Sequence, residues 1–90
     1  MTVEIVIPAF LQPFTDGTGL AETDSTTLGG CLDGLVSRFP RLREKLYVGN
    51  NVLHNGINVF INGQRADPKD LARPVADGYI IHLAYVTVGG

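Results

Sequence analysis

The sequence predicts an α+β domain in which short strands, paired as hairpins, surround one main helix. Three observations predict this fold class. Apolar and polar residues alternate near both ends of the chain, an Asn62-Gly63 pair separates two strand-like runs, and one segment has helical periodicity. The 90 residues suffice for one domain, and 44% hydrophobic with 18% charged residues is typical of a folded chain.

The first half of the chain begins with an expected hairpin. Side chains alternate over residues 2–7, which is typical of a half-buried strand. The apolar bend at 9–14 contains Pro13, which a regular central strand does not tolerate. The turn pair Asp16-Gly17 then leads to a second strand at Leu20–Thr23, expected to run antiparallel to the first.

The segment from Thr27 to Phe39 is expected to be the main helix. Its apolar residues recur at spacings of three and four: Leu28, Cys31, Leu32, Leu35, Val36 and Phe39. Ser25 or Thr26 is expected to cap the helix start. Three glycines inside the segment each weaken helix propensity by about 1 kcal/mol relative to alanine. We therefore expect packing against the sheet to stabilise this helix.

A short second helical turn is expected after Pro40, anchored by Leu42 and Leu46. The polar residues 48–56 form a long connection. A strand at Ile57–Ile61 then enters the Asn62-Gly63 turn, where both positions need positive φ.

The last part of the chain returns to the sheet. A short strand at Gln64–Ala66 follows the turn, and Pro68–Leu71 is expected to form a single helical turn with Asp67 as its cap. Tyr79 to Val86 is the longest strand candidate. If this last strand pairs with the first, the sheet is mixed and the helix is the crossover.

Composition excludes several classes of function. The net charge is −2, and no basic cluster exceeds the spaced group Arg38, Arg41, Arg43 and Lys45, so nucleic-acid binding is not expected. No run is long enough to cross a membrane and the start lacks a signal-peptide pattern, which predicts a cytoplasmic protein without membrane association. Cys31 is the only cysteine, so we expect neither a disulfide nor an iron–sulfur cluster, and we assign no metal site and no catalytic residue.

The chain ends in two glycines. Gly89 and Gly90 lack a Cβ, so this end can follow an extended path into the active site of another protein. We expect residues 1–86 to form the folded domain and residues 87–90 to form a flexible tail, whose four residues reach roughly 13 to 14 Å.

Four stretches together resemble the ThiS/MoaD family of ubiquitin-like sulfur carrier proteins. They are the opening 3–15 segment with its two prolines, the helix and its continuation at 32–46, the hairpin run 58–63, and residues 77–90 from Asp-Gly to Gly-Gly. The resemblance implies the ubiquitin-like β-grasp fold, a mixed sheet of four to five strands with one main helix across one face. Tyr79 and Tyr85 depart from the family pattern, in which many relatives have an acidic residue and a proline.

The resemblance also implies a chemistry. An E1-like adenylating enzyme of the ThiF/MoeB type would use ATP-Mg to activate the carboxylate of Gly90, with Gly89 as its slim neighbour. Sulfur transfer would then give a thiocarboxylate for a sulfur-accepting biosynthetic enzyme. The carrier itself would bind no cofactor. The length and the long connection favour the carriers of cysteine biosynthesis and their MoaD-like relatives, with molybdopterin synthesis second.

Residue parity on the last strand predicts a docking face. Ile81 and Leu83 are expected to face the helix, whereas Ile80, His82 and Ala84, together with Phe60, are expected on the open face of the sheet. With Thr87 and Val88 of the tail, these residues form the expected partner-binding set.

Two other functions remain open at this stage. In the first, the chain is a ubiquitin-like modifier, whose Gly90 forms an isopeptide with a lysine of a target protein. The second is a non-catalytic β-grasp interaction domain, for which the two terminal glycines have no role. Cys31 lies on the expected buried stripe and is interpreted as a core residue rather than a sulfur carrier.

Overall fold

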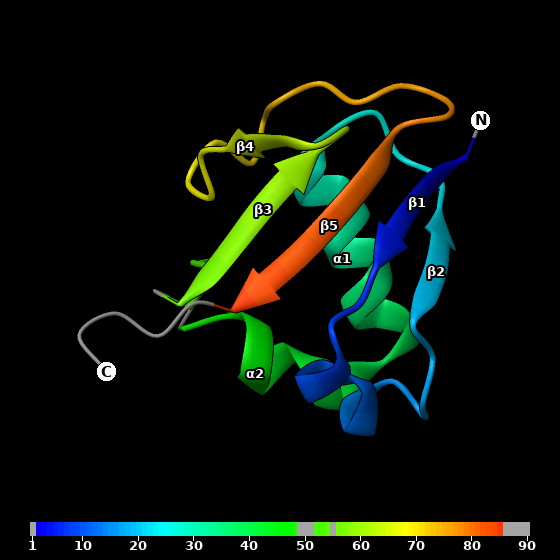
Figure 1. Ribbon diagram of the computed structural model, residues 1–90, viewed down its shortest axis with the longest axis vertical. Coiled ribbons are helices and arrows are strands. Elements are labelled where there is room, and N and C mark those ends of the chain that lie inside the picture. Colours follow the sequence, from blue (N-terminus) through cyan, green and yellow to red (C-terminus); the bar gives the residue numbers. More distant parts are fainter. Residues whose placement is uncertain (1, 49–51, 55, 86–90) are drawn as a thin grey trace.

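The computed structural model describes residues 2–48, 52–54 and 56–85, and it is built around a five-stranded mixed sheet (Figure 1). The sheet order is β2-β1-β5-β3-β4. The strands are β1 (Val3–Val6), β2 (Leu20–Thr23), β3 (Ile57–Ile61), β4 (Gln64–Ala66) and β5 (Ile80–Tyr85). β1 and β5 pair in parallel, and the other neighbouring pairs are antiparallel. The predicted α+β fold with a mixed sheet is therefore confirmed.

The main helix α1 (Leu28–Arg38) covers one face of this sheet (Figure 1). Five of its side chains are buried, namely Leu28, Cys31, Leu32, Leu35 and Val36. From the sheet, the inward side chains of the central strands, such as Ile5, Val59 and Ile81, are fully buried in the same core. Burying such a side chain stabilises the fold by roughly 1.5 to 3 kcal/mol. Packing thus compensates for the glycines in α1, as expected, and Cys31 is a core residue.

Three short helical segments lie at one end of the sheet (Figure 1). The apolar bend forms the 3₁₀ helix η1 (Ala9–Phe14), and η2 (Pro40–Leu42) runs into the single turn α2 (Arg43–Leu46). Each is fixed by a fully buried leucine, Leu11 in η1 and the predicted anchors Leu42 and Leu46 in η2 and α2.

The cap of α1 is Thr27, so the prediction of Ser25 or Thr26 was wrong. The Thr27 hydroxyl oxygen accepts a hydrogen bond from the Gly30 N–H at 3.0 Å. Ser25 acts one step earlier, because its hydroxyl oxygen accepts from the Thr27 N–H at 3.3 Å. The residue expected to cap the helix thus forms the turn that positions the actual cap.

The segment between β4 and β5 is tied to the start of α1. The Leu28 N–H donates to the Arg73 carbonyl at 2.9 Å, and the Gly29 N–H donates to the Leu71 carbonyl at 2.8 Å. The prediction of a helical turn at Pro68–Leu71 was wrong, since these residues form turns. The carbonyls of this segment satisfy first-turn amides of α1 that have no partner inside the helix.

The Asn62-Gly63 hairpin is confirmed by its backbone angles. Asn62 has φ 51° and Gly63 has φ 83°, the pair of positive values that this two-residue turn requires. The turn fixes the β3–β4 register, in which Ile61 lies opposite Gln64. β1 is one residue shorter at each end than the predicted 2–7 strand, and β5 begins at Ile80 instead of Tyr79, while Val86 lies outside the described residues. The outer strands β2 and β4 have the predicted bounds.

Tyr47 closes the core beside α2. Its hydroxyl donates to the Asp33 carboxylate of α1 at 3.3 Å, and only 5% of the residue is exposed. Burial, reinforced by the negative charge of Asp33, raises the pKa of Tyr47 from 10.0 to about 12. The neutral phenol is therefore favoured in the folded state.

Two glycine substitutions in α1 are expected to have opposite effects on stability. A Cβ at Gly34 would come no closer than 3.9 Å to Thr23, so Gly34→Ala should raise the free energy of unfolding by about 1 kcal/mol through helix propensity. A Cβ at Gly29 would lie 2.9 Å from the Leu71 carbonyl oxygen. The hydrogen bonds from the Gly29 and Leu28 N–H groups to the Leu71 and Arg73 carbonyls hold that segment in place. Gly29→Ala should therefore lower the free energy of unfolding by about 1 kcal/mol or more. Urea denaturation of both variants measures this; a stabilising Gly29→Ala would contradict the described packing.

Stability is expected to fall at alkaline pH through Tyr47. Because the folded-state pKa of Tyr47 is raised, the stability that its neutral phenol contributes is complete below pH 10 and is lost as the pH rises through about 12. Tyr47→Phe should remove this dependence and the tyrosinate absorbance step near pH 12. Unfolding free energies across this range, with wild type measured in parallel, provide the test; identical pH profiles would contradict the raised pKa of Tyr47.

Candidate docking face

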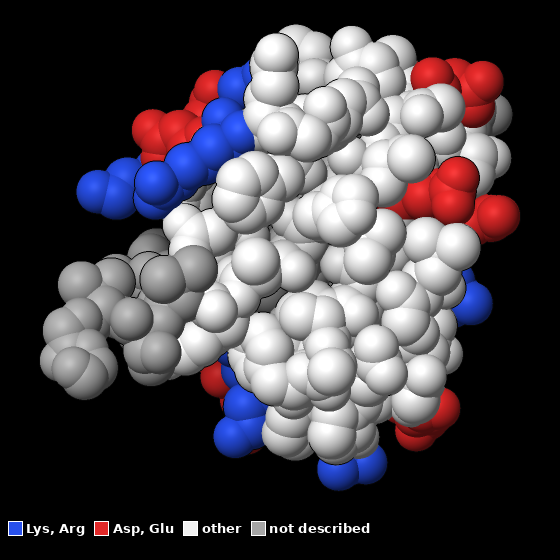
Figure 2. Space-filling view, viewed as in Figure 1, with Lys and Arg blue, Asp and Glu red and all other residues white. Residues whose placement is uncertain are grey.

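The face of the sheet opposite α1 has no covering element among the described residues (Figure 1). The register aligns four outward side chains across four strands: Phe60 of β3 lies opposite His82 of β5, His82 beside Val6 of β1, and Val6 opposite Leu20 of β2. Figure 2 shows that the middle of this face carries no charged side chain, whereas Lys, Arg, Asp and Glu lie around its rim. An uncharged strip with a charged rim is typical of a protein-binding surface.

The structure places the predicted docking residues on this face. Ile80 is 37% exposed, His82 is exposed, and Ala84 and Phe60 are half-buried, while the alternate residues Ile81 and Leu83 are buried under α1. Their role in binding stays a prediction. The other members of the expected set, Thr87, Val88, Gly89 and Gly90, lie outside the described residues.

Two members of the strip were missed by the sequence analysis. Val6 and Leu20 extend the uncharged row across β1 and β2, and Leu20 is 52% exposed. The alternation in residues 2–7 already placed Val6 on the face of the sheet opposite the core, so its exposure could be predicted from the sequence. Only the pairing of the first strand with the last showed that Val6 and His82 are neighbours.

Charges define the limits of the strip. Glu4 and Glu22 lie opposite each other on β1 and β2, and Glu4 is also the neighbour of Ile80 on β5. At the other edge, Arg65 of β4 lies opposite Phe60. One side of the strip is therefore acidic and the other basic, which restricts the orientations in which a charged partner can bind.

An aromatic cluster lies at the end of β5. The Tyr85 ring is 5.1 Å from that of Phe10 in η1 and 6.0 Å from that of His54, measured between ring centroids. Gly56 provides the space, because a Cβ there would overlap the Tyr85 ring. Tyr85, identified from the sequence only as a departure from the family pattern, thus anchors the end of β5 against two distant segments.

The described residues provide no site for metal binding or thiol chemistry. Among them, no group of three or more His, Cys, Asp or Glu side chains is arranged to hold a metal ion, and Cys31 is a buried free thiol. Within the same residues, none of the helices has the length and apolar character needed to span a bilayer.

Comparison with known proteins identifies the class. No family model and no curated protein matches the sequence, but solved structures match along its whole length. SAMP1 from Haloferax volcanii has a TM-score of 0.85 and 28% identity, with both chains covered in full. A chain of the BexX/CysO complex from Amycolatopsis orientalis has a TM-score of 0.82 and 26% identity over 98% of this chain and 99% of its own. CysO from Mycobacterium tuberculosis has a TM-score of 0.81 over 94% and 99%, and at 24% identity it supports the fold alone.

The fold and the open face define a ubiquitin-like β-grasp protein. Within that class, the neighbours confirm the resemblance to the ThiS/MoaD family of ubiquitin-like sulfur carriers, including its cysteine carriers. These neighbours are small carrier and modifier proteins rather than catalytic enzymes.

Proposed function

We propose that this chain is a sulfur carrier whose terminal glycine, Gly90, is activated by an E1-like enzyme of the ThiF/MoeB type. The observation that carries the proposal is the agreement in fold over full length with SAMP1 and with a chain of the BexX/CysO complex, at 28% and 26% identity. Synthesis of cysteine or a related metabolite is the first-ranked pathway and molybdopterin the second.

The chemistry requires an activating partner. A carboxylate resists nucleophilic attack because of its charge, so its oxygen first attacks the α-phosphorus of ATP, with Mg²⁺ bound to the nucleotide, and pyrophosphate leaves. Hydrosulfide then attacks the acyl carbon of Gly90, AMP leaves, and a proton is lost to give the thiocarboxylate. The carrier provides only the acyl group. Gly89 allows close approach, since it has no side chain to obstruct the partner's active site.

The docking face supports this role by providing a surface for the partner. The uncharged strip through Phe60, His82 and Val6 offers apolar area whose burial favours association, and Ile80 adds to it. The BexX/CysO structure is a complex of two proteins. We propose that the open sheet face of this chain contacts its activating enzyme in a complex of that kind, with Thr87 and Val88 joining the contact from the tail.

Ubiquitin-like modification is the second candidate, and the similarity to SAMP1, a small archaeal modifier protein, favours it specifically. In this alternative, a lysine amine attacks the activated Gly90 carbonyl in place of hydrosulfide. The two functions share the adenylation step and differ in the nucleophile that follows.

Intact-mass measurement tests the carrier function. The full chain, incubated with its cognate activating enzyme, ATP-Mg and sulfide, should exchange one terminal oxygen for sulfur, and a chain lacking Gly89 and Gly90 should not. The enzyme's ATP–pyrophosphate exchange with the full chain provides the control for its activity. The carrier function is contradicted if ATP–pyrophosphate exchange proceeds but the chain gains no sulfur. If blots then show conjugates of high mass, the modifier function replaces it.

Ile80→Glu is expected to weaken binding to the activating enzyme about tenfold or more, because it places a charge within the strip beside Glu4. Val52→Glu is the matched control, since Val52 is more exposed, at 57% against 37%, and lies outside the strands. Calorimetric titration measures both variants, and circular dichroism confirms their fold. Equal affinities of the two variants would exclude the open face as the docking surface.

A further inference from the structure

The cations of this protein are concentrated in one short segment. Residues 38–45 hold four of the seven lysines and arginines and one of the nine carboxylates, so the segment has a net charge of +3 and the rest of the chain −5. In the structure this segment is the end of α1, η2 and most of α2. A basic surface on an otherwise acidic protein attracts negatively charged partners to one place.

Each of these cations lies over an aromatic ring. The Arg41 guanidinium and the Lys45 ammonium are 5.9 and 5.2 Å from the centroid of the Phe14 ring in η1. The other two cations use neighbouring rings, Arg38 over Phe39 at 5.4 Å and Arg43 over Tyr47 at 5.8 Å. A ring contact holds a cation in position without cancelling its charge. The four charges are thus oriented but not neutralised by these contacts.

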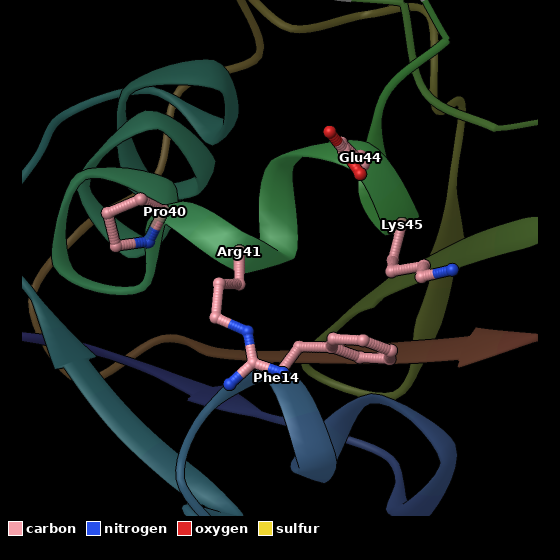
Figure 3. Close-up of a pocket in the computed structure, with 5 residues that line it drawn as sticks. All are labelled: Phe14, Pro40, Arg41, Glu44 and Lys45. Carbon is pink, nitrogen blue, oxygen red and sulfur yellow. The ribbon is translucent and has the colours of Figure 1, made fainter.

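A cleft of about 530 Å³ lies within this basic ridge, defined here as Arg38, Arg41, Arg43 and Lys45. Phe14, Pro40 and Arg41 line it together with Glu44 and Lys45. Figure 3 shows the Arg41 side chain reaching from η2 to Phe14 of η1, whose ring extends from there toward the side of Lys45. Glu44 extends from the other side of α2, away from the Phe14 ring (Figure 3). Two of the four cations, Arg41 and Lys45, therefore line the cleft beside the Phe14 ring.

The arrangement of charges distinguishes among anionic ligands. A compact phosphate requires several donors that converge on one point. Only Arg41 and Lys45 share a ring, whereas Arg38 and Arg43 lie over two other rings. Stacking of a nucleotide base on Phe14 is disfavoured because two cations already occupy the ring. A nucleic-acid duplex is also disfavoured, since it would extend beyond the ridge over the part of the chain with a charge of −5.

We propose that the basic ridge is a docking site for an acidic segment of a partner protein. Carboxylates spaced along an extended chain match the spaced cations. The site uses no atom of the carboxy-terminal residues. Its test is therefore independent of whether Gly90 is activated.

The experiment is a titration of the isotope-labelled full chain with a short synthetic peptide of alternating glutamate and aspartate, followed by NMR. Amide shifts should concentrate in residues 38–47 and in η1, and affinity should fall as salt increases. Arg41→Gln with Lys45→Gln should weaken binding about tenfold, whereas the matched pair Arg65→Gln with Lys69→Gln should change it less than about twofold. The charge-preserving pair Arg41→Lys with Lys45→Arg should retain most of the affinity.

Three outcomes would overturn the proposal. The first is no localised shift with the acidic peptide, or the same shifts with its glutamine and asparagine analogue. The second is equal weakening by the two neutralising pairs, which would indicate general charge attraction. The third is tighter binding of ATP or of a short DNA duplex than of the peptide, which would identify a nucleotide or nucleic-acid site instead.

Discussion

The parallel pairing of β1 with β5 is the interaction on which the rest of the structure depends. It joins the two ends of the folded chain at the centre of the sheet, with Ile5 beside Ile81, and the Glu4 N–H donates to the Tyr79 carbonyl at 3.0 Å. Each hairpin contributes one central strand, so neither half completes the sheet alone. The same pairing aligns Val6 with His82, which makes the uncharged strip continuous from β3 to β2.

A sheet with one helix has two faces with different roles. α1 buries the inward side chains and leaves the other face of the sheet open. The uncharged strip on that face can take part in aggregation as well as in binding. The edges limit that risk, because β2 and β4 have four and three residues and carry charged side chains such as Glu22 and Arg65. The strip is thus accessible from above the sheet, while pairing along its edges is disfavoured.

Local patterns predicted the elements, and contacts between distant residues determined the rest. Alternation located the strands and the open face, and Asn62-Gly63 located the hairpin, since these signals depend on neighbouring residues alone. The helix cap was assigned wrongly because three successive residues, Ser25 to Thr27, can all cap a helix. The hydrogen bond from Leu28 to the distant Arg73 carbonyl fixes where α1 begins. Likewise, the ring contact of Tyr85 with Phe10 joins residues 75 positions apart and has no local signal.

The uncharged strip and the basic ridge would attract partners by different forces, and η1 contributes to the ridge alone. Phe10, near its start, contacts Tyr85 at the end of β5, whereas Phe14, at its other end, lies beneath Arg41 and Lys45. Charge attraction acts at distances up to a Debye length of about 8 Å at physiological salt and mainly accelerates encounter, whereas apolar burial acts at contact and slows dissociation. A partner that used both surfaces would be attracted by the ridge and retained by the strip. Because salt screens one force and not the other, the two contributions are separable in the association and dissociation rates of a single complex.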